Sequence, residues 1–468
     1  MACKSFITAR MSKPDTSVAS TDDLTVSEPA SAVPPPENED DDDRNDRTFF
    51  RSRLLRNIRN ALKENGPLAA MFAVVFVNLV GFGIVVPLMP FFAQSLKAQA
   101  WQVTLMFTTY SLGQFFAEPY FGRLSDRIGR KPILIVTTAL SVLFYILLAF
   151  SPNIWVAILV RFFSGLSSGN ISTIQGYVSD VSPPEKRSGR MSLIGGAFSL
   201  GFIIGPFIGG MLSHETAAGG NQFQLPLVGA AILSAIASFG VMLFIRESRQ
   251  RRTKAEAAQP NILKTAQEAV RNPVILRVIL ATLCYMAAFA GLESTFGLWA
   301  EARFHWGPKE IGAIFLPLGI AAALMQMVFM RPLVRRYGES RVLATGLFVF
   351  GLSFVLQGVN SINWLIVPIV MLGALGQAVI FSSICAIISL STPPDKQGAM
   401  LGLNMSTGAI ARISGPMFAG FFFSVLGPDA SLWMGAGMTL PAALLALQVG
   451  KLRKQQAKLQ TGQEQGQI

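Results

Sequence analysis

The sequence predicts an all-α membrane protein with twelve transmembrane helices in two pseudo-symmetric six-helix bundles. Three observations lead to this prediction: few charged residues, a series of long apolar segments, and a repeat that relates the two halves. Of the 468 residues, 51% are hydrophobic and only 14% are charged, whereas soluble domains usually carry about 25% charged residues. Most of the chain is therefore expected to face lipid or other helices.

The first segment, residues 1–64, is expected to form a cytoplasmic tail in two parts. Residues 1–47 hold 11 of the 27 acidic residues, and a composition this polar cannot bury enough surface to fold alone. Residues 51–63 interleave Arg and Lys with Leu and Ile, the pattern of a basic amphipathic helix on a membrane surface. The tail is thus predicted to be disordered up to this helix.

Twelve apolar segments follow, each close to the about 20 residues that cross a bilayer. They are expected to be helices, because lipid offers the backbone no hydrogen-bond partner. They cover residues 69–92, 101–121, 132–150, 154–179, 191–213, 225–245, 274–300, 311–330, 342–359, 364–390, 398–424 and 430–450.

Basic residues predict the orientation of these helices. One set of connections and tails near the spans holds about 30 Lys and Arg, and the opposite set holds only Lys97, Arg303 and Lys309. Because basic loops stay in the cytoplasm, both termini are expected there. The predicted organisation is a first six-helix half, a central cytoplasmic loop, a second six-helix half and a cytoplasmic tail, at residues 65–246, 247–272, 273–450 and 451–468.

The two halves repeat at an offset of about 210 residues. Gly129 corresponds to Gly338, and the Gly205-Pro206 pair corresponds to Gly415-Pro416. Ser182-Pro183-Pro184 likewise corresponds to Thr392-Pro393-Pro394. Internal repeats with a binding site at their interface are typical of secondary transporters.

Enzyme chemistry is not expected. The three cysteines form no spaced cluster and there are two histidines, so neither a disulfide framework nor a zinc site is predicted. No G-x-x-x-x-G-K-[ST] motif occurs, which argues against ATP. The excess of basic residues lies in short loops, so nucleic acid is not an expected partner. No catalytic residue, metal or cofactor is predicted; the expected partners are a small organic substrate, protons and the lipid bilayer, and the expected state is a monomer.

The loop after the second span reads Gly122-Arg123-Leu124-Ser125-Asp126-Arg127-Ile128-Gly129-Arg130-Lys131. It resembles the signature G-x-L-a-D-R-x-G-R-K/R of the major facilitator superfamily, although a generic basic loop is the alternative. Gly122 would let two helices approach, and Gly129 supplies turn freedom. Asp126 can hold Arg127 or Arg130, or face a helix N-terminus. These five residues form the predicted gating motif.

The fifth span carries Gly201, Gly205, Pro206, Gly209 and Gly210. Glycines at helical spacing allow close helix packing, and a proline can kink the span. The pattern resembles the motif G-x-x-x-G-P-x-x-G-G, found chiefly in exporters of the superfamily. Ordinary packing of small residues is the alternative.

Arg161 lies in the fourth span, about 12 Å deep at ~1.5 Å per residue. A buried Arg is costly unless it is paired or hydrated, so it is functional by default. Its context resembles the span-four motif R-x-x-x-G of the superfamily, which implies a role in proton coupling. Structural pairing is the alternative, with Asn78 of the first span as a possible partner.

Two carboxylates, Glu118 and Glu293, also lie inside spans. A buried carboxylate can take up and release protons near neutral pH, which a proton antiporter requires. Glu118 could instead support the Asp126 loop, and Glu293 could pair with Arg412. The predicted proton-coupling set is Arg161, Glu118, Glu293 and Asp126. The predicted substrate-binding residues are Asn78, Gln114, Gln175, Glu293, Trp299, Gln326, Gln377 and Arg412.

The resemblance covers about residues 68–450 and is closest to the drug/proton antiporter branch, especially tetracycline-efflux-type members. It implies proton-coupled efflux of an amphiphilic organic compound or drug, as in multidrug resistance. That branch usually has an acid where Asn78 stands, so a proton site in the first span is in doubt. The alternatives are transport of a metabolite or an organic anion held by Arg161 and Arg412, and a non-transporting receptor or scaffold. The cell membrane is the expected location, with an organelle membrane as the alternative.

Overall fold

The structure is a computed structural model that describes residues 66, 68–183, 186–213, 223–248, 262–393 and 396–465. All of these residues belong to one compact unit, Ala61–Ile468. The predicted acidic tail and basic amphipathic segment, residues 1–64, lie outside the described residues.

The described residues form helices and no strand. The N-terminal spans are residues 68–85 with η1 (Val86–Leu88) and α2 (Met89–Ser95), α3 (Ala100–Ile128), α4 (Arg130–Ala149), α5 (Ile154–Ser167) with α6 (Ile171–Asp180), α7 (Arg187–Leu212) and α8 (Gln224–Phe244). The C-terminal spans are α10 (Pro273–Phe304), α11 (Pro308–Leu324) with the π-helical turn η3 (Met325–Phe329) and α12 (Met330–Tyr337), α13 (Glu339–Val359), η4 (Asn363–Leu365) with α14 (Ile366–Leu390), α15 (Gln397–Leu426) and α16 (Ala430–Gln465). Helix α9 (Ile262–Arg271) lies in the predicted central loop.

Eleven helical segments of the described chain are long and apolar enough to cross a membrane. Helix α3, with 29 residues, is a further long helix that is less apolar. Tyr110, Ser111 and Gln114 of α3 line an internal cavity, which explains why this helix carries polar side chains at membrane depth. The protein is thus an all-α membrane protein, as predicted.

Local sequence sets the helix boundaries. The Asn153 side chain accepts a hydrogen bond from the Val156 N–H and caps α5. Asn272 caps α10 in the same way, and Pro273 follows as the first helical residue. Each asparagine side chain accepts from a backbone N–H that has no partner within the helix. Proline suits the first helical position because it has no backbone N–H that would need a partner.

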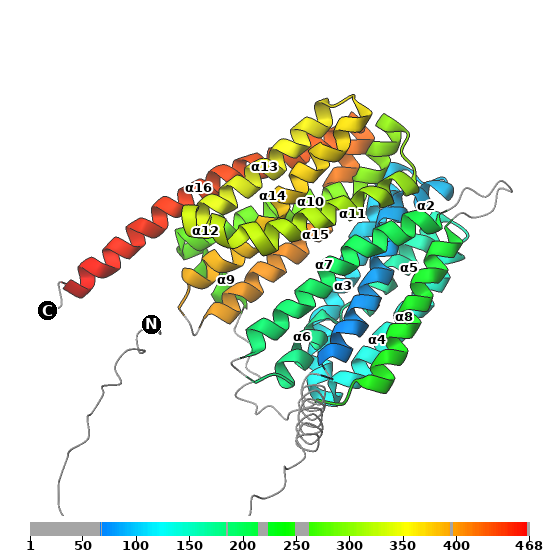
Figure 1. The fold of residues 1–468 in the computed structure, drawn as a ribbon, viewed down its shortest axis with the longest axis horizontal. Coiled ribbons are helices and arrows are strands. Elements are labelled where there is room, and N and C mark those ends of the chain that lie inside the picture. Colours follow the sequence, from blue (N-terminus) through cyan, green and yellow to red (C-terminus); the bar gives the residue numbers. More distant parts are fainter. Residues whose placement is uncertain are drawn as a thin grey trace, which may run out of the picture. The chain divides into compact units, whose positions relative to one another are not determined.

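Two pairs of helices join the N-terminal spans to the C-terminal spans. Helix α7 packs along α11, and α3 packs along α15 (Figure 1). In the α7–α11 pair, a Cβ at Gly210 would meet the Pro308 carbonyl oxygen at 2.8 Å and the Gly312 Cα at 2.9 Å. In the α3–α15 pair, Thr108 Oγ1 donates to the Ile413 carbonyl at 3.3 Å.

The glycine contacts that bridge the two groups of spans lie at one end of the molecule or near its middle. We call this the distal end; it carries the connections at 96–99, 305–307 and 427–429. The opposite end, here the loop end, carries Gly129. In its half of α7 and α15, a Cβ at Gly195 or at Gly402 would meet nothing within 4 Å. The distal end is therefore the more tightly closed of the two.

The repeat is visible in the backbone. Gly129 and Gly338, related by an offset of 209, both have positive φ angles, +114° and +79°. Each ends one long helix and begins the next. Glycine adopts such angles without a steric penalty, so both halves make the same turn at the loop end.

Candidate transport chamber and gate

Two cavities inside the helix bundle meet at Glu293. The larger one, here the polar cavity, has a volume of about 300 Å³ and is lined by helix 68–85 and by α3, α4, α5, α6, α7, α10 and α15. The smaller one, here the apolar cavity, has a volume of about 140 Å³ and adds residues of α11, α13 and α14. Among the described residues, Glu293 is the only ionisable one in the lining of the apolar cavity. Together the two cavities form a chamber with one polar end and one apolar end.

Arg161 supplies a buried positive charge to the polar cavity. Its side chain is only 1% exposed, and its guanidinium lies 4.2 Å from the centre of the Tyr110 ring. Nε and Nη1 are buried and make no hydrogen bond within the described chain. Asn78, the possible partner, lines the same cavity but forms no hydrogen bond with Arg161 in the described chain. A cation–π contact offsets part of the lost hydration, but it leaves the N–H donors unsatisfied.

Glu293 and Arg412 complete the ionic lining. Glu293 projects from α10 and Arg412 from α15, and both line the polar cavity with Arg161. In the part of the chain that the structure describes, none of these three side chains forms an ion pair with another. Burying a charge without a partner is costly. A ligand or a proton that pairs with one of these groups would therefore be stabilised.

The structure brings together four of the eight predicted binding residues at the polar cavity, Asn78, Gln114, Glu293 and Arg412, and places Arg161 of the proton-coupling set with them. Gln377 lines the apolar cavity.

Three predicted binding residues lie elsewhere. Trp299 is fully buried and donates from Nε1 to Asp429 at 2.8 Å, so it fixes α10 to the α15–α16 connection. Gln326 is exposed and donates to Ser382 at 2.6 Å. Gln175 is exposed on α6. None of the three lines either cavity.

Sequence reasoning missed the tyrosines of the chamber. The chain has six tyrosines, and Tyr110, Tyr145 and Tyr285 all line the polar cavity. A phenolic hydroxyl at membrane depth needs a polar neighbour. Tyrosines placed well inside apolar spans were therefore a usable signal for a polar interior.

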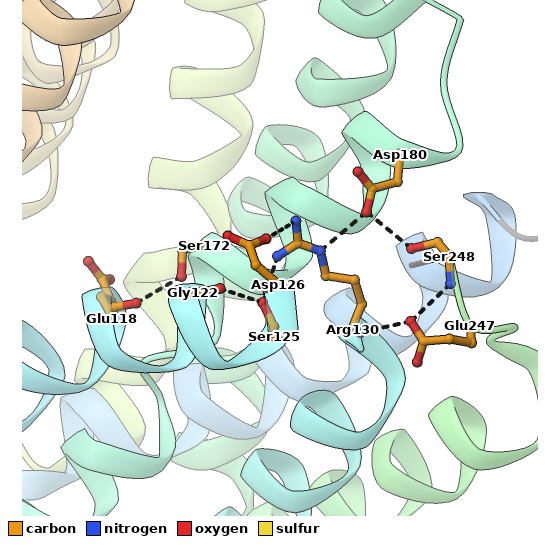
Figure 2. A network of polar contacts seen from close by, with 9 residues as sticks. All are labelled: Glu118, Gly122, Ser125, Asp126, Arg130, Ser172, Asp180, Glu247 and Ser248. Atoms are coloured by element: carbon orange, nitrogen blue, oxygen red, sulfur yellow. Dashed lines mark hydrogen bonds and ion pairs between the residues drawn. The ribbon is translucent and has the colours of Figure 1, made fainter. Parts of the chain in front are cut away.

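The predicted gating motif forms a compact ionic network at the loop end (Figure 2). Of the two arginines considered as partners of Asp126, Arg130 is the one it contacts: Nη2 lies 2.6 Å from Asp126 Oδ1. Arg130 Nε lies 3.2 Å from Asp180 Oδ2, and Nη1 donates to Ser125 Oγ at 2.6 Å. The Arg130 side chain is 6% exposed. Arg127 is exposed.

Glu247 closes the network from the end of α8. Its carboxylate accepts from the backbone N–H groups of Arg130 at 2.8 Å and Lys131 at 3.1 Å. These are the first N–H groups of α4, so the acid caps this helix and complements its dipole. A Cβ at Gly129 would lie 2.5 Å from Glu247 Oε2, so the glycine is required for contact as well as for its φ angle.

The other predicted glycines also mark close approaches. A Cβ at Gly122 would lie 3.0 Å from Ser172 Oγ. On α7, added Cβ atoms at Gly201, Gly205 and Gly209 would meet helix 68–85, while Gly210 faces α11. Thus α7 packs one face against the first span and another against α11. Pro206 lies between Gly205 and Gly209 in the sequence of this helix.

Glu118 lies on α3 and lines neither cavity. Its backbone carbonyl accepts from Ser172 Oγ at 3.0 Å (Figure 2). Asp126 likewise belongs to the loop-end network. Of the four predicted proton-coupling residues, Arg161 and Glu293 are therefore the two that share the chamber.

The sequence model of the Major Facilitator Superfamily matches residues 71–336 and 299–467. The chain belongs to the Major Facilitator Superfamily. It is 25% identical over 399 residues to the tetracycline resistance protein, class C, of Escherichia coli, covering 84% of this chain and 98% of that protein. It is 24% identical over 386 residues to the quinolone resistance protein NorA of Staphylococcus aureus (strain MRSA252), covering 82% and 96%. The predicted resemblance to tetracycline-efflux-type members of this superfamily is confirmed.

Solved structures of the superfamily share the fold. The human organic anion transporter MFSD10 (TETRAN) matches with a TM-score of 0.61 and 23% identity, over 82% of this chain and 99% of that chain. The nucleoside transporter NupG matches with a TM-score of 0.66 and 14% identity, over 83% and 99%. The fold and the family are those of membrane transporters rather than enzymes. Within the described residues, no group of three or more His, Cys, Asp and Glu could hold a metal ion.

Proposed function

We propose that this superfamily member exports an amphiphilic organic compound in exchange for protons. The observation that carries the proposal is the position of Glu293, where the polar and apolar cavities meet. A carboxylate there can bind either a proton or a cationic or hydrogen-bond-donating group of the cargo. Competition of proton and cargo for one group is what exchange requires.

The surroundings of Glu293 suit a proton site. The titratable and charged side chains that share the polar cavity with it come from five helices: Tyr110 of α3, Tyr145 of α4, Arg161 of α5, Tyr285 of α10 and Arg412 of α15. The two guanidinium groups favour the ionised carboxylate, and the apolar wall disfavours it. These opposing influences allow the carboxylate to change its protonation state when cargo binds or when the chamber changes its access.

Three observations support export by alternating access. The distal end is the more tightly closed end, so the chamber is ready to load from the loop end. We propose that the loop end and both termini face the cytoplasm, because the basic residues gather in those connections. The relatives named above are resistance proteins, and α7 carries the glycine-proline pattern described above.

Efflux of a fluorescent amphiphilic dye from loaded cells tests the proposal. Cells that express the wild type are expected to lose the dye faster than empty cells, and an uncoupler should abolish the difference. E293Q keeps the shape of the side chain but cannot exchange protons, so it should lose the uncoupler-sensitive efflux. The matched control is E301Q, because Glu301 lies on the same helix, about two turns further on, and lines neither cavity. Equal uncoupler-sensitive efflux in E293Q and the wild type would refute exchange at Glu293.

A second candidate function is facilitated transport of an organic anion or other metabolite. It is favoured by the two guanidinium groups of Arg161 and Arg412 in the polar cavity. MFSD10, which shares the fold, is described as an organic anion transporter. This function predicts that E293Q still equilibrates an anion across vesicles without moving protons.

A further inference from the structure

The polar cavity holds a positive charge that the protein does not neutralise. Arg161 is 1% exposed, and its Nε and Nη1 atoms are buried without a hydrogen-bond partner in the described chain. Its guanidinium lies over the Tyr110 ring, 4.2 Å from the ring centre. A buried arginine without acceptors indicates that an acceptor arrives from outside the protein, because N–H donors left unpaired in a dry site are costly.

The other side chains of the cavity supply less negative charge than its two cations carry. Arg412 adds a second cation, and Glu293 is the single acid in the lining. Neither cation lies within ion-pair distance of Glu293 among the described residues. Asn78 and Gln114 are neutral. The lining therefore carries two positive groups against one negative group, and an ionised Glu293 balances only one of them.

We propose that the cargo carries an acidic group, of the carboxylate class, that binds the Arg161 guanidinium. A guanidinium presents five N–H donors in a planar fork that matches a carboxylate. This inference rests on the proposed exchange at Glu293, which requires a basic or donor group on the same cargo. The cargo class is then an amphiphilic zwitterion: its acidic group binds at Arg161, its basic group at Glu293, and its apolar body in the apolar cavity.

The order of polar and apolar side chains along the chamber agrees with a bipolar compound. Glu293 lines both cavities, and Arg161 lines only the polar one. The lining of the apolar cavity is dominated by aliphatic and aromatic side chains, among them Phe289, Phe296 and Phe315. A ligand with both charged groups at one end of an aromatic body fits this arrangement. Its charged groups would contact the polar cavity, and its aromatic body would contact the apolar cavity.

Four fluorescent probes with one aromatic skeleton test the proposal. They carry an acid and an amine, the amine alone, the acid alone, or neither, with amide groups in place of the missing charges. Binding to the purified protein in detergent and transport into vesicles are measured for the wild type, R161Q, R161K and E293Q. The wild type should bind the zwitterion roughly 10- to 100-fold more tightly than the amine-only probe, as expected for a charge-assisted hydrogen bond.

For R161Q, the dissociation constants of the zwitterion and the amine-only probe should agree within about twofold. This ratio is far smaller than the ratio expected for the wild type. R161K keeps the charge but not the fork, so it should retain an intermediate preference. E293Q should keep the preference for an acid and should move no protons. Elution as a single species and a cooperative thermal transition in detergent show that each variant is folded.

Two results would overturn the inference. One is the absence of any preference for an acidic group in wild-type binding. The other is an equal loss in R161Q for probes with and without the acid, because Arg161 would then shape the chamber without recognising a charge. The proposed function fails separately: if the wild type prefers the acid but no probe moves protons, recognition at Arg161 stands and exchange at Glu293 does not.

Discussion

Replacing Gly210 by alanine is expected to keep the distal end from closing fully. Gly210 lies on α7 where this helix touches α11, and an added Cβ would lie 2.8 Å from the Pro308 carbonyl oxygen and 2.9 Å from the Gly312 Cα. Both of these are backbone atoms, so neither can rotate away. The two helices must separate by several tenths of an ångström, or the conformation closed at the distal end must be populated less.

The size of the effect follows from the cost of overpacking. Inserting a methyl group into a well-packed contact costs about 1–3 kcal/mol. A cost of about 2 kcal/mol changes a conformational equilibrium roughly 30-fold, because 1.4 kcal/mol corresponds to a factor of ten. A conformation open at the distal end would not make this contact, so G210A should shift the population toward it.

Distances between spin labels measure this shift. Ser95 in α2 and Lys309 in α11 are exposed at the distal end, one in each group of spans, and can carry labels in a background without the three cysteines. Pulsed electron resonance should show a narrow short distance for the parent protein. For G210A it should show a longer distance as the main population.

The matched control for G210A is G195A on the same helix. A Cβ at Gly195 meets nothing within 4 Å, so this change carries the same gain in helix propensity without the contact. Its distance distribution should match that of the parent. If G210A and G195A give the same distribution, the closure of the distal end does not depend on the approach of α7 to α11, and the reasoning is refuted.

Three stability predictions concern the loop end and the chamber, each measured by thermal unfolding in detergent. G129A should destabilise the protein by more than G338A, because both force a side chain to adopt a positive φ but only Gly129 also faces the Glu247 carboxylate, 2.5 Å from an added Cβ; equal losses would contradict this. R130M should cost about 1–3 kcal/mol, because it removes charge-assisted contacts to Asp126 and Asp180 from a side chain that is 6% exposed; a loss below 1 kcal/mol would show that the network is solvated. R161M should raise stability by about 1–3 kcal/mol, because it removes buried unsatisfied donors, even after loss of a cation–π contact worth about 2 kcal/mol; a lower melting temperature would show that Arg161 has a structural partner.

The number of spans and the special turns could be predicted because their causes are local. Lipid forces every backbone group to pair within its own segment, so an apolar run of sufficient length is a helix. The turn at Gly129 needs a residue that tolerates a positive φ, so a glycine at this position of the sequence indicates the turn. The same reasoning applies to the close approach at Gly210, where only the absence of a side chain allows contact.

The chamber was harder to predict, because a side chain reaches it only if its helix presents the right face. Glu293 and Trp299 lie six positions apart on α10, about 120° apart around the helix, and of the two only Glu293 lines the chamber. Trp299 is buried against Asp429 instead. Gln326 lies in the π-helical turn η3, and the extra residue in such a turn changes the direction of the side chains that follow. Sequence spacing alone gives no sign of the π turn.

The two copies of the loop differ in charge even though their backbones agree. Arg130 follows Gly129, and Glu339 follows Gly338 at the equivalent position. Arg130 is bound by acids from three helices or their ends and is almost fully buried. Glu339 instead contacts Arg453 of the last helix at 3.6 Å, and both side chains are about one quarter exposed.

This difference means that the two halves are not held with equal strength at the loop end. The buried Arg130–Asp180 pair is screened little by salt, whereas the Glu339–Arg453 pair, one quarter exposed and at 3.6 Å, is screened more and contributes little. In the second copy Arg335 stands in place of Asp126, so there is no acid on the preceding helix to complete a network. Glycine is retained in both copies because the turn needs it. The charges differ because the turn does not depend on them, so the contacts of Arg130 with Asp126 and Asp180 in the first copy have no equivalent at the turn between α12 and α13.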